Sequence, residues 1–403
     1  MNIENLILTG FRFNFSEKKE IICINMKTNI CLLLTLPLLL FSACNGSKEN
    51  GSSSGDDKGI FISATATYGE DNSIVFGGKL KRENFHLSLQ YEKRTVDVDP
   101  NDFDVSLSSN NTFTTESIDA TISLKDDPTI KATVKLNPKV RKSLKVLFIG
   151  NSFSDDTIQW MYEIAEDYGI NVIVENMYIG GCTLDTHYSN ILNDSPNYQW
   201  VHRVNNAWAR TSNYRLSIAI QAQDWDFISF QQSSGSSGIE STYGNLNNLL
   251  QRAELYLQNP EHTQFVWNMT WAYQSDSTES AFANYNRNQT IMYQSICNAV
   301  QSQILPNNKL VTIIPNGTAI QNARTSYIGD HLCRDGYHLS LDMGRYIVGL
   351  NAIKTLTGVN VDDCKYTTVN ETQTLIAKES VNNSQLNKFA VTTSEYQNNP
   401  NAD

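Results

Sequence analysis

The sequence predicts an α/β protein, a parallel sheet covered by helices on both faces, preceded by a small all-β sandwich of immunoglobulin type. From residue 144 onward, short continuous apolar runs alternate with stretches of helical length, as in parallel sheets. Before that, apolar and polar residues alternate in short segments separated by Asn, Asp, Gly and Pro, as in antiparallel strands. The 403 residues suffice for two domains, which we predict at 59–140 and 143–395.

Each predicted element follows from one of these two patterns. The sandwich strands are expected in IFISATATY, SIVFGGKL, FHLSLQYE, FDVSLSS, ATISLK and KATVKLNP. In the α/β domain, strands are expected at 144–150, 170–179, 224–232, 263–273 and 309–315. Helices are expected at 157–169, 242–257, 279–304 and 341–358, the last of which would close the domain. Functional sites in such sheets lie beyond the carboxyl ends of the strands.

The N-terminal segment is predicted to be a lipoprotein signal rather than part of a folded domain. Lys27 precedes the apolar stretch ICLLLTLPLLLF, and FSAC ends at Cys44, which resembles a bacterial lipid-attachment site. Residues 26–44 would be the signal, and 1–25 an over-extended start. The Gly, Ser and charged residues of 45–58 predict a flexible tether. We therefore expect an exported protein, periplasmic or at the cell surface, that its N-terminal lipid anchors to a membrane.

Composition and short motifs exclude several kinds of site. The net charge is −11 and Lys and Arg are not clustered, so nucleic acid is not an expected partner. The sequence has neither a phosphate-binding Gly-x-x-x-x-Gly-Lys nor a His-Glu-x-x-His motif, and we expect no cofactor and no metal. The four cysteines after Cys44 lack CxxC spacing, and whether they form a disulfide stays open: Cys182, Cys297, Cys333 and Cys364.

The carboxyl ends of the predicted strands carry residues suited to catalysis. They read GNSFS, IGGCT, QQSSG and TWAY. Ser152, in VLFIGNSFSDD, is either a cap for the next helix or a nucleophile. A serine nucleophile needs a histidine base oriented by a carboxylate. Asp335 and His338, in RDGYHLS, are close enough for one turn to bring them together, while His331 beside Asp330 is a competing base.

Together these motifs resemble those of the SGNH (GDSL-like) hydrolase family. GNSFS resembles the first block, with Asn151 where Asp often stands; ENMYIGGCTL resembles the second and DGYHLS the closing block. The chain resembles in particular an exported, DUF4886-like branch of bacteroidal type and uncharacterised function. The resemblance covers about 144 to 360 and implies a flavodoxin-like three-layer fold. It also implies that Ser152 is the nucleophile, His338 the base and Asp335 its orienting partner.

The resemblance further implies an oxyanion hole. Its donors would be the backbone amides of Ser152 and Gly181 and a third group, which in the family is usually an Asn side chain. The third strand ends in FQQSSG and has no such Asn, so Gln231 or Gln232 is expected to replace it.

The helix after the first strand is expected to begin near Thr157, with Ser154 and Asp155 as its caps, which leaves Ser152 free. The α/β-hydrolase elbow, Gly-x-Ser-x-Gly, does not fit because position 154 is Ser.

Aromatic residues near the strand ends suggest a carbohydrate substrate, because flat rings suit the apolar faces of sugars. They are Trp160, Tyr178, Tyr188, Trp267, Trp271 and Tyr273. Trp160 and Trp267 are expected in the core, whereas Asn151, Trp271 and Tyr273 are expected to bind substrate. The expected activity is hydrolysis of acyl esters, above all acetyl esters, on a carbohydrate. The alternative is a non-catalytic, glycan-binding surface lipoprotein on a hydrolase fold.

Overall fold

The computed structural model describes residues 57–398. The predicted lipoprotein signal, its Cys44 and nearly all of the tether lie outside the described residues. The described residues belong to one compact unit. No helix in this part of the chain combines the length and the apolar character needed to cross a membrane.

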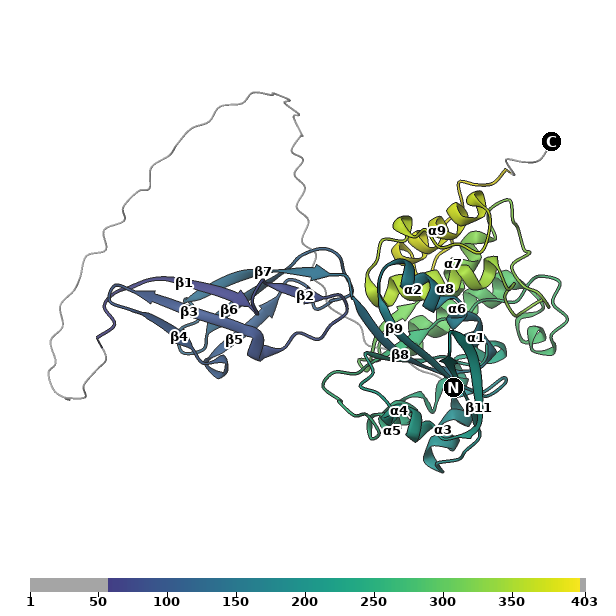
Figure 1. Cartoon of the computed structure of the whole chain (residues 1–403), viewed down its shortest axis with the longest axis horizontal. Coiled ribbons are helices and arrows are strands. Elements are labelled where there is room, and N and C mark those ends of the chain that lie inside the picture. The colour runs from purple at the N-terminus through teal and green to yellow at the C-terminus, as the bar shows by residue number, and fades with distance from the viewer. Residues whose placement is uncertain (1–56, 399–403) are drawn as a thin grey trace, which may run out of the picture. The chain divides into compact units, whose positions relative to one another are not determined.

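The first part of the described chain is all-β, as predicted (Figure 1). One sheet has the order β1-β3-β4 and the other the order β2-β7-β6-β5. Alternate residues of both sheets, among them Leu87, Ile122 and Leu136, are buried in a common core, which explains the alternating sequence pattern. The strands are β1 (Phe61–Tyr68), β2 (Ser73–Val75), β3 (Phe85–Tyr91), β4 (Thr95–Val98), β5 (Phe103–Leu107), β6 (Ile118–Leu124) and β7 (Lys131–Lys139).

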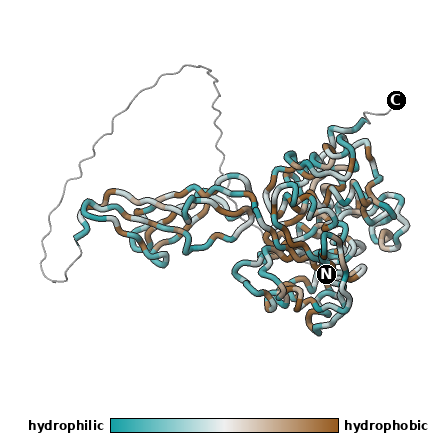
Figure 2. The backbone as a smooth tube through the Cα atoms, in the orientation of Figure 1, coloured by the Kyte–Doolittle hydropathy of each residue, from teal (hydrophilic) through white to brown (hydrophobic). Residues whose placement is uncertain are grey.

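The α/β part is built on a seven-stranded sheet of order β11-β10-β9-β8-β12-β13-β14. Its strands are β8 (Ser143–Gly150), β9 (Asn171–Tyr178), β10 (Tyr198–Val204), β11 (Ala207–Tyr214), β12 (Phe227–Phe230), β13 (Gln264–Asn268) and β14 (Leu310–Ile314). The five strands β9, β8, β12, β13 and β14 are parallel, and the hairpin β10–β11 adds an antiparallel edge. Hydrophobic residues are concentrated in the central strands (Figure 2). The predicted fold class is therefore confirmed.

Helices cover both faces of this sheet (Figure 1). The α/β helices are α1 (Ser152–Ile158), α2 (Met161–Asp167), α3 (Leu184–Leu192), α4 (Leu216–Gln221), α5 (Leu246–Glu254), α6 (Gln289–Gln303), α7 (Asn316–Ala323), α8 (Met343–Thr357) and α9 (Glu371–Leu386). Helices α1, α2, α7, α8 and α9 pack together on one face, and α3, α4 and α5 lie on the other.

Some predicted elements differ from the structure. The predicted helix 157–169 is two helices, and the first begins at Ser152, five residues earlier than expected. The predicted helix 279–304 is a 3-10 helix, η5 (Ser280–Tyr285), followed by α6. The break coincides with Asn286 and Arg287, which both have positive φ angles that no helix accommodates. Helix α8 does not close the domain, because α9 follows and packs against it.

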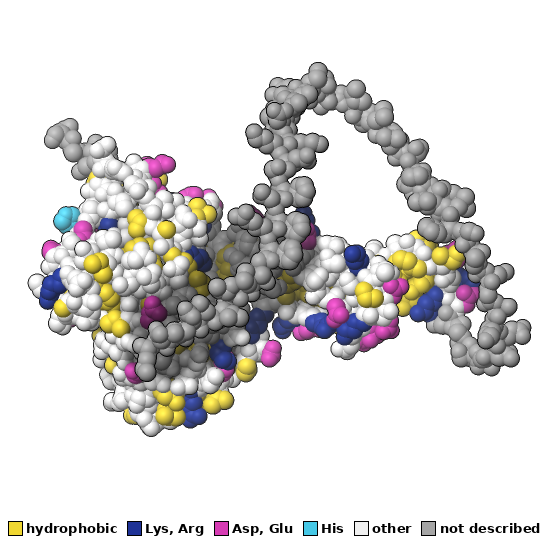
Figure 3. All heavy atoms as spheres, turned by 180° about the vertical axis from the view of Figure 1, so that it is seen from behind, with side chains coloured by type: hydrophobic (Ala, Val, Ile, Leu, Met, Phe, Trp, Pro, Cys, Tyr) yellow, Lys and Arg dark blue, Asp and Glu magenta, His cyan; other side chains and the backbone are white. Residues whose placement is uncertain are grey.

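Charged side chains of both signs are scattered over the face shown in Figure 3. This distribution agrees with the absence of Lys and Arg clusters in the sequence.

Candidate active site

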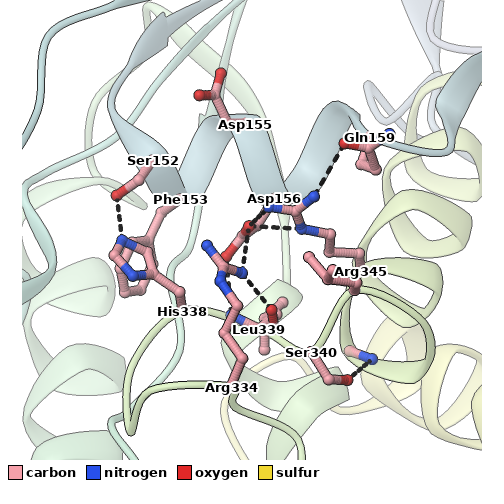
Figure 4. Close-up of polar contacts among 12 residues, drawn as sticks. Ser152, Phe153, Asp155, Asp156, Gln159, Arg334, His338, Leu339, Ser340 and Arg345 are labelled. Atoms are coloured by element: carbon pink, nitrogen blue, oxygen red, sulfur yellow. Dashed lines mark hydrogen bonds and ion pairs between the residues drawn. The ribbon is translucent and has the colours of Figure 1, made fainter.

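Ser152, His338 and Asp335 converge at the carboxyl end of the sheet, and Figure 4 shows the contact between Ser152 and His338. Ser152 Oγ lies 2.8 Å from His338 Nε2, and His338 Nδ1 lies 2.7 Å from Asp335 Oδ2. One imidazole thus joins a hydroxyl to a carboxylate through its two nitrogens, the arrangement in which a serine can be activated. The competing His331 is exposed and makes no hydrogen bond with Ser152.

The turn between β8 and α1 places Ser152. Asn151 is the N-cap of α1, since its Oδ1 accepts a hydrogen bond from Phe153 N, and Ser152 is the first helical residue. The expected caps, Ser154 and Asp155, are wrong because the helix has already begun before them. Ser154 Oγ instead donates to Gln231 Oε1 at 2.7 Å. Gly150 permits this packing, because a Cβ there would collide with the Ser154 hydroxyl.

Segment 334–340 carries Asp335 and His338. It is held by hydrogen bonds within the segment and by hydrogen bonds from the loop at 269–274, which follows β13. Asp335 Oδ1 accepts the backbone N–H of His338 at 2.8 Å, which forms the tight turn that the Asp-x-x-His spacing predicts. Trp271 Nε1 donates to Tyr337 O at 2.8 Å, and Gln274 N donates to Gly336 O at 2.8 Å. His338 is therefore held in place by Asp335 on one side and by the loop at 269–274, through Gly336 and Tyr337, on the other.

Asp156 anchors the same segment and was missed by the sequence analysis (Figure 4). Its side chain is 1% exposed. It accepts hydrogen bonds from Leu339 N at 2.8 Å, Arg345 Nε at 2.8 Å and Arg334 Nη1 at 3.2 Å. The double aspartate in SFSDD was the available signal, because two adjacent carboxylates beside a buried strand need cationic partners.

The pKa of the Asp335 carboxyl lies below its ordinary value, which favours the ionised form. Burial raises this pKa, but hydrogen bonds from the side chain and backbone of His338 outweigh the effect of burial. Asp335 can therefore stabilise a positive charge on His338 whenever that charge forms.

Two backbone amides near Ser152 have no acceptor. Among the described residues, neither the N–H of Ser152, at the start of α1, nor that of Gly181, in the loop after β9, makes a hydrogen bond. Gly181 has a φ of +62°, which glycine adopts without strain. Both residues line the same cavity, so these amides are available to an oxyanion.

Neither glutamine fills the third position, in contrast to the expectation. Gln231 is 1% exposed, and its Nε2 donates to Asn151 Oδ1 at 2.8 Å. Gln232 is equally buried, and its Nε2 donates to Thr242 O at 2.9 Å. Both side chains bond partners inside the protein, and neither residue lines the cavity beside Ser152.

The cavity beside Ser152 has a volume of about 460 Å³ and a lining that is both polar and apolar. Its wall includes Ser234, Tyr273, Glu279 and Asn284, and no Lys or Arg. Glu279 and Asn284 were missed by the sequence analysis, because they lie in a segment that was read as a continuous helix. Glu279 makes no ion pair with any described residue.

The predicted aromatic residues divide into those that line the cavity and those that support it. Tyr178 and Tyr273 line it, as does Tyr337, which was not predicted. Trp271 does not: it is fully buried and stacks on Phe153 with ring centroids 4.2 Å apart, so its predicted contact with substrate is wrong.

The remaining predicted aromatic residues lie away from the cavity wall. Trp267 is in the core, as expected. Trp160 is only partly buried and Tyr188 does not line the cavity.

All four described cysteines are free thiols.

Comparison with known proteins assigns a family. A model described as "Domain of unknown function (DUF4886)" matches residues 145–384. The crystal structure of a DUF4886 family protein from Bacteroides uniformis is 37% identical, with a TM-score of 0.61 over 64% of this chain and 100% of that chain. No curated protein matches.

Other solved structures are similar to the chain at much lower identity and TM-score. Axe2, an acetylxylan esterase from Geobacillus stearothermophilus, is 13% identical, with a TM-score of 0.34 over 58% of this chain and 99% of that one. A GDSL-like lipase from Bacteroides thetaiotaomicron is 12% identical, with a TM-score of 0.29 over 52% and 84%. The chain belongs to the DUF4886 family.

Proposed function

We propose that the protein is a serine esterase that hydrolyses short acyl esters, above all acetyl esters, on a carbohydrate. The observation that carries this proposal is the chain of short contacts from Ser152 Oγ through His338 to Asp335, at the mouth of a cavity. A serine that only capped a helix would not require a histidine at 2.8 Å with its own carboxylate partner.

The reaction would proceed in two steps. Ser152 Oγ attacks the ester carbonyl carbon while its proton passes to His338 Nε2, and the N–H groups of Ser152 and Gly181 bind the carbonyl oxygen as it becomes negative. His338 then returns the proton to the leaving alcohol oxygen as the C–O bond breaks. In the second step water attacks the acyl-enzyme, His338 accepts its proton, and Ser152 leaves with that proton.

The cavity favours an uncharged, hydroxyl-rich alcohol. Its volume lies within the usual range of small-molecule pockets, about 300 to 1,000 Å³. The rings of Tyr178 and Tyr337 offer flat apolar surface, while Glu279 and Asn284 offer hydrogen-bond partners for hydroxyls. Tyr273 also lines the cavity, but it is almost fully buried. Anionic substrates would meet Glu279 and no cation among the lining residues. These features support a neutral sugar ester.

For localisation, we propose that the protein is exported and anchored to a membrane through lipid on Cys44, with residues 59–140 as a spacer between the anchor and an esterase at 143–395. Cys44→Ala should release the protein from the membrane fraction of the producing cells. Retention of this variant in the membrane fraction would contradict the anchor.

The experiment for the activity uses p-nitrophenyl acetate and a serine-directed fluorophosphonate. We expect turnover by the wild type, covalent labelling of Ser152, and a loss of kcat in Ser152→Ala of about 10⁴-fold or more. His338→Ala should lose activity similarly, whereas His331→Ala, the matched control, should keep it. A wild type that binds acetylated glycans but neither turns over esters nor reacts with the probe would support the non-catalytic alternative.

A further inference from the structure

A row of buried side-chain amides crosses the α/β core and ends beside Ser152. It starts in α9, passes through α8, α7 and β13 to the end of β12, and reaches the turn after β8. Its members are Gln385, Asn351, Asn316, Asn268, Gln231 and Asn151. The five from Asn351 to Asn151 are each at most 1% exposed.

The half of the row far from the site has one direction. Gln385 Nε2 donates to Asn351 Oδ1 at 2.6 Å. Asn351 Nδ2 donates to Asn316 Oδ1 at 3.0 Å, and Asn316 Nδ2 donates to Asn268 Oδ1 at 2.8 Å. Each of these amides therefore donates one N–H to the next member on the side of Ser152.

The half near the site continues in the same direction. Asn268 Nδ2 donates to Gln231 Oε1 at 3.0 Å, and Gln231 Nε2 donates to Asn151 Oδ1 at 2.8 Å. Asn151 Nδ2 in turn donates one of its two N–H groups to Cys182 O, at a long 3.4 Å. Cys182 follows Gly181, so the Asn151 amide lies beside the loop that carries the second free backbone amide.

The direction of the row is set at its Asn151 end. The backbone N–H of Phe153 can only donate, so the Asn151 atom that it contacts at 3.0 Å must be the oxygen. The Gln231 atom bonded to that oxygen must then be the nitrogen, which turns Gln231 Oε1 toward Asn268. The same reasoning fixes each further amide, because every carbonyl oxygen requires a donor from the next.

We infer that the side-chain amide of Asn151 is the third oxyanion donor, and that the row of amides behind it holds and polarises this amide. Asn151 lines the cavity together with Ser152 and Gly181, whereas Gln231 and Gln232 do not. The inference rests on the proposed esterase activity, because it assigns a donor to the oxyanion of that reaction.

Aligned amides are suited to this role. Each hydrogen bond in such a chain strengthens the next, by about 10–30% in condensed-phase estimates, and the dry core does not screen the effect. A negative oxygen forming beside Ser152 is bound by groups that need no reorganisation.

Asn151→Asp tests the donor. Aspartate keeps the oxygen that accepts from Phe153 N and from Gln231 Nε2, so the cap and the end of the row survive, but it has no N–H. We expect kcat for p-nitrophenyl acetate to fall about 100-fold or more, with KM within about threefold. Asn151→Ser, a neutral residue that can also cap a helix, should lose a similar factor, which separates the missing donor from the added charge.

The Ki of a boronic acid inhibitor distinguishes an oxyanion donor from a residue with only a structural role, because a purely structural role of Asn151 would leave this Ki unchanged. The inhibitor forms a tetrahedral adduct with the serine and so samples the oxyanion hole. Its Ki should rise in both Asn151 variants in parallel with the loss of kcat/KM.

Gln231→Met tests the row, and Gln232→Met is its matched control. The two residues are adjacent and equally buried, but only Gln231 bonds Asn151. We expect Gln231→Met to lower kcat about tenfold and Gln232→Met distinctly less, when both variants are compared at temperatures equally far below their unfolding midpoints.

The inference is overturned if the wild type is active and both Asn151 variants keep kcat within threefold, or if Gln232→Met loses more kcat than Gln231→Met. Failure of the proposed function is a different result: the wild type then shows no turnover and no labelling of Ser152, and the inference fails with it.

Discussion

Asp156→Asn should damage both the stability and the activity of the protein. The change keeps the shape of the side chain but removes the negative charge that Arg334 and Arg345 share, at 3.2 and 2.7 Å. The new amide N–H₂ group must also face either the backbone N–H of Leu339 or the two guanidinium groups. Both are donors, so the N–H₂ group would have no hydrogen-bond acceptor.

The size of the effect follows from burial. Asp156 is 1% exposed and Arg345 16%, but Arg334 is 32% exposed, so water partly solvates one of the two cations. Breaking a buried ion pair costs about 3–5 kcal/mol, and the lower end applies here. With about 2–4 °C lost per kcal/mol in large domains, the unfolding midpoint should fall by roughly 6–12 °C. The loosened segment carries His338, and a misplacement of about 1 Å costs up to about 100-fold in rate.

The assay combines thermal unfolding with kcat for p-nitrophenyl acetate at a temperature where the variant is folded. Glu163→Gln is the matched control, because it breaks the 2.6 Å pair with Arg203, which lies outside the 334–340 segment. The control should lose stability and keep kcat. A folded Asp156→Asn variant with kcat within twofold of the wild type would refute the reasoning, as would an equal loss of kcat in Glu163→Gln.

Three further predictions concern buried groups. Burial lowers the pKa of His187 to about 3 from 6.5. Above pH 6.5 the imidazole is neutral in both the folded and the unfolded chain, so His187 does not affect the free energy of unfolding. As the pH falls from 6.5 toward 3, only the unfolded chain takes up the proton, and the fold is destabilised. At about 1.4 kcal/mol per pH unit, His187→Gln should remove about 2–3 kcal/mol of the stability loss between pH 6.5 and 4.5, as measured by urea unfolding; an unchanged pH dependence would contradict this. Gly150→Ala should cost about 1–3 kcal/mol and lower kcat, because its Cβ would displace Ser154; calorimetry showing wild-type stability would exclude the predicted collision. Trp271→Phe loses the bond to Tyr337 O but keeps a ring in the core, so kcat should fall more than KM changes, and a variant that raises KM alone would instead show a direct contact with substrate.

The sequence predicted the sheet and the three residues that meet in it, because both depend on local patterns. Continuous apolar runs predict the parallel strands, and the three-residue spacing of Asp335 and His338 predicts their turn. The antiparallel hairpin at 198–214 was missed. The two strands lie at the edge of the sheet and consist mostly of polar and aromatic residues. They contain no continuous apolar run of the kind that marks the parallel strands.

The orientation of side chains at the strand ends could not be predicted from spacing. Gln231 and Gln232 both follow β12, and a glutamine in this position can reach either a cavity or the core. The structure turns both inward because Asn151 and Thr242 supply partners from distant segments. Trp271 was expected at the surface of the site for the same reason, since sequence does not show that Phe153 and Tyr337 O lie against it.

The row of amides also constrains how the sequence can evolve. Each of its inner members gives a hydrogen bond to one neighbour and takes one from the other. Replacing an inner member by a residue without an amide therefore leaves two partners without a match. A lineage could not exchange these residues one at a time without passing through a less stable intermediate. We therefore expect the six positions, which are spread over more than 230 residues of chain, either to be substituted together or to remain unchanged.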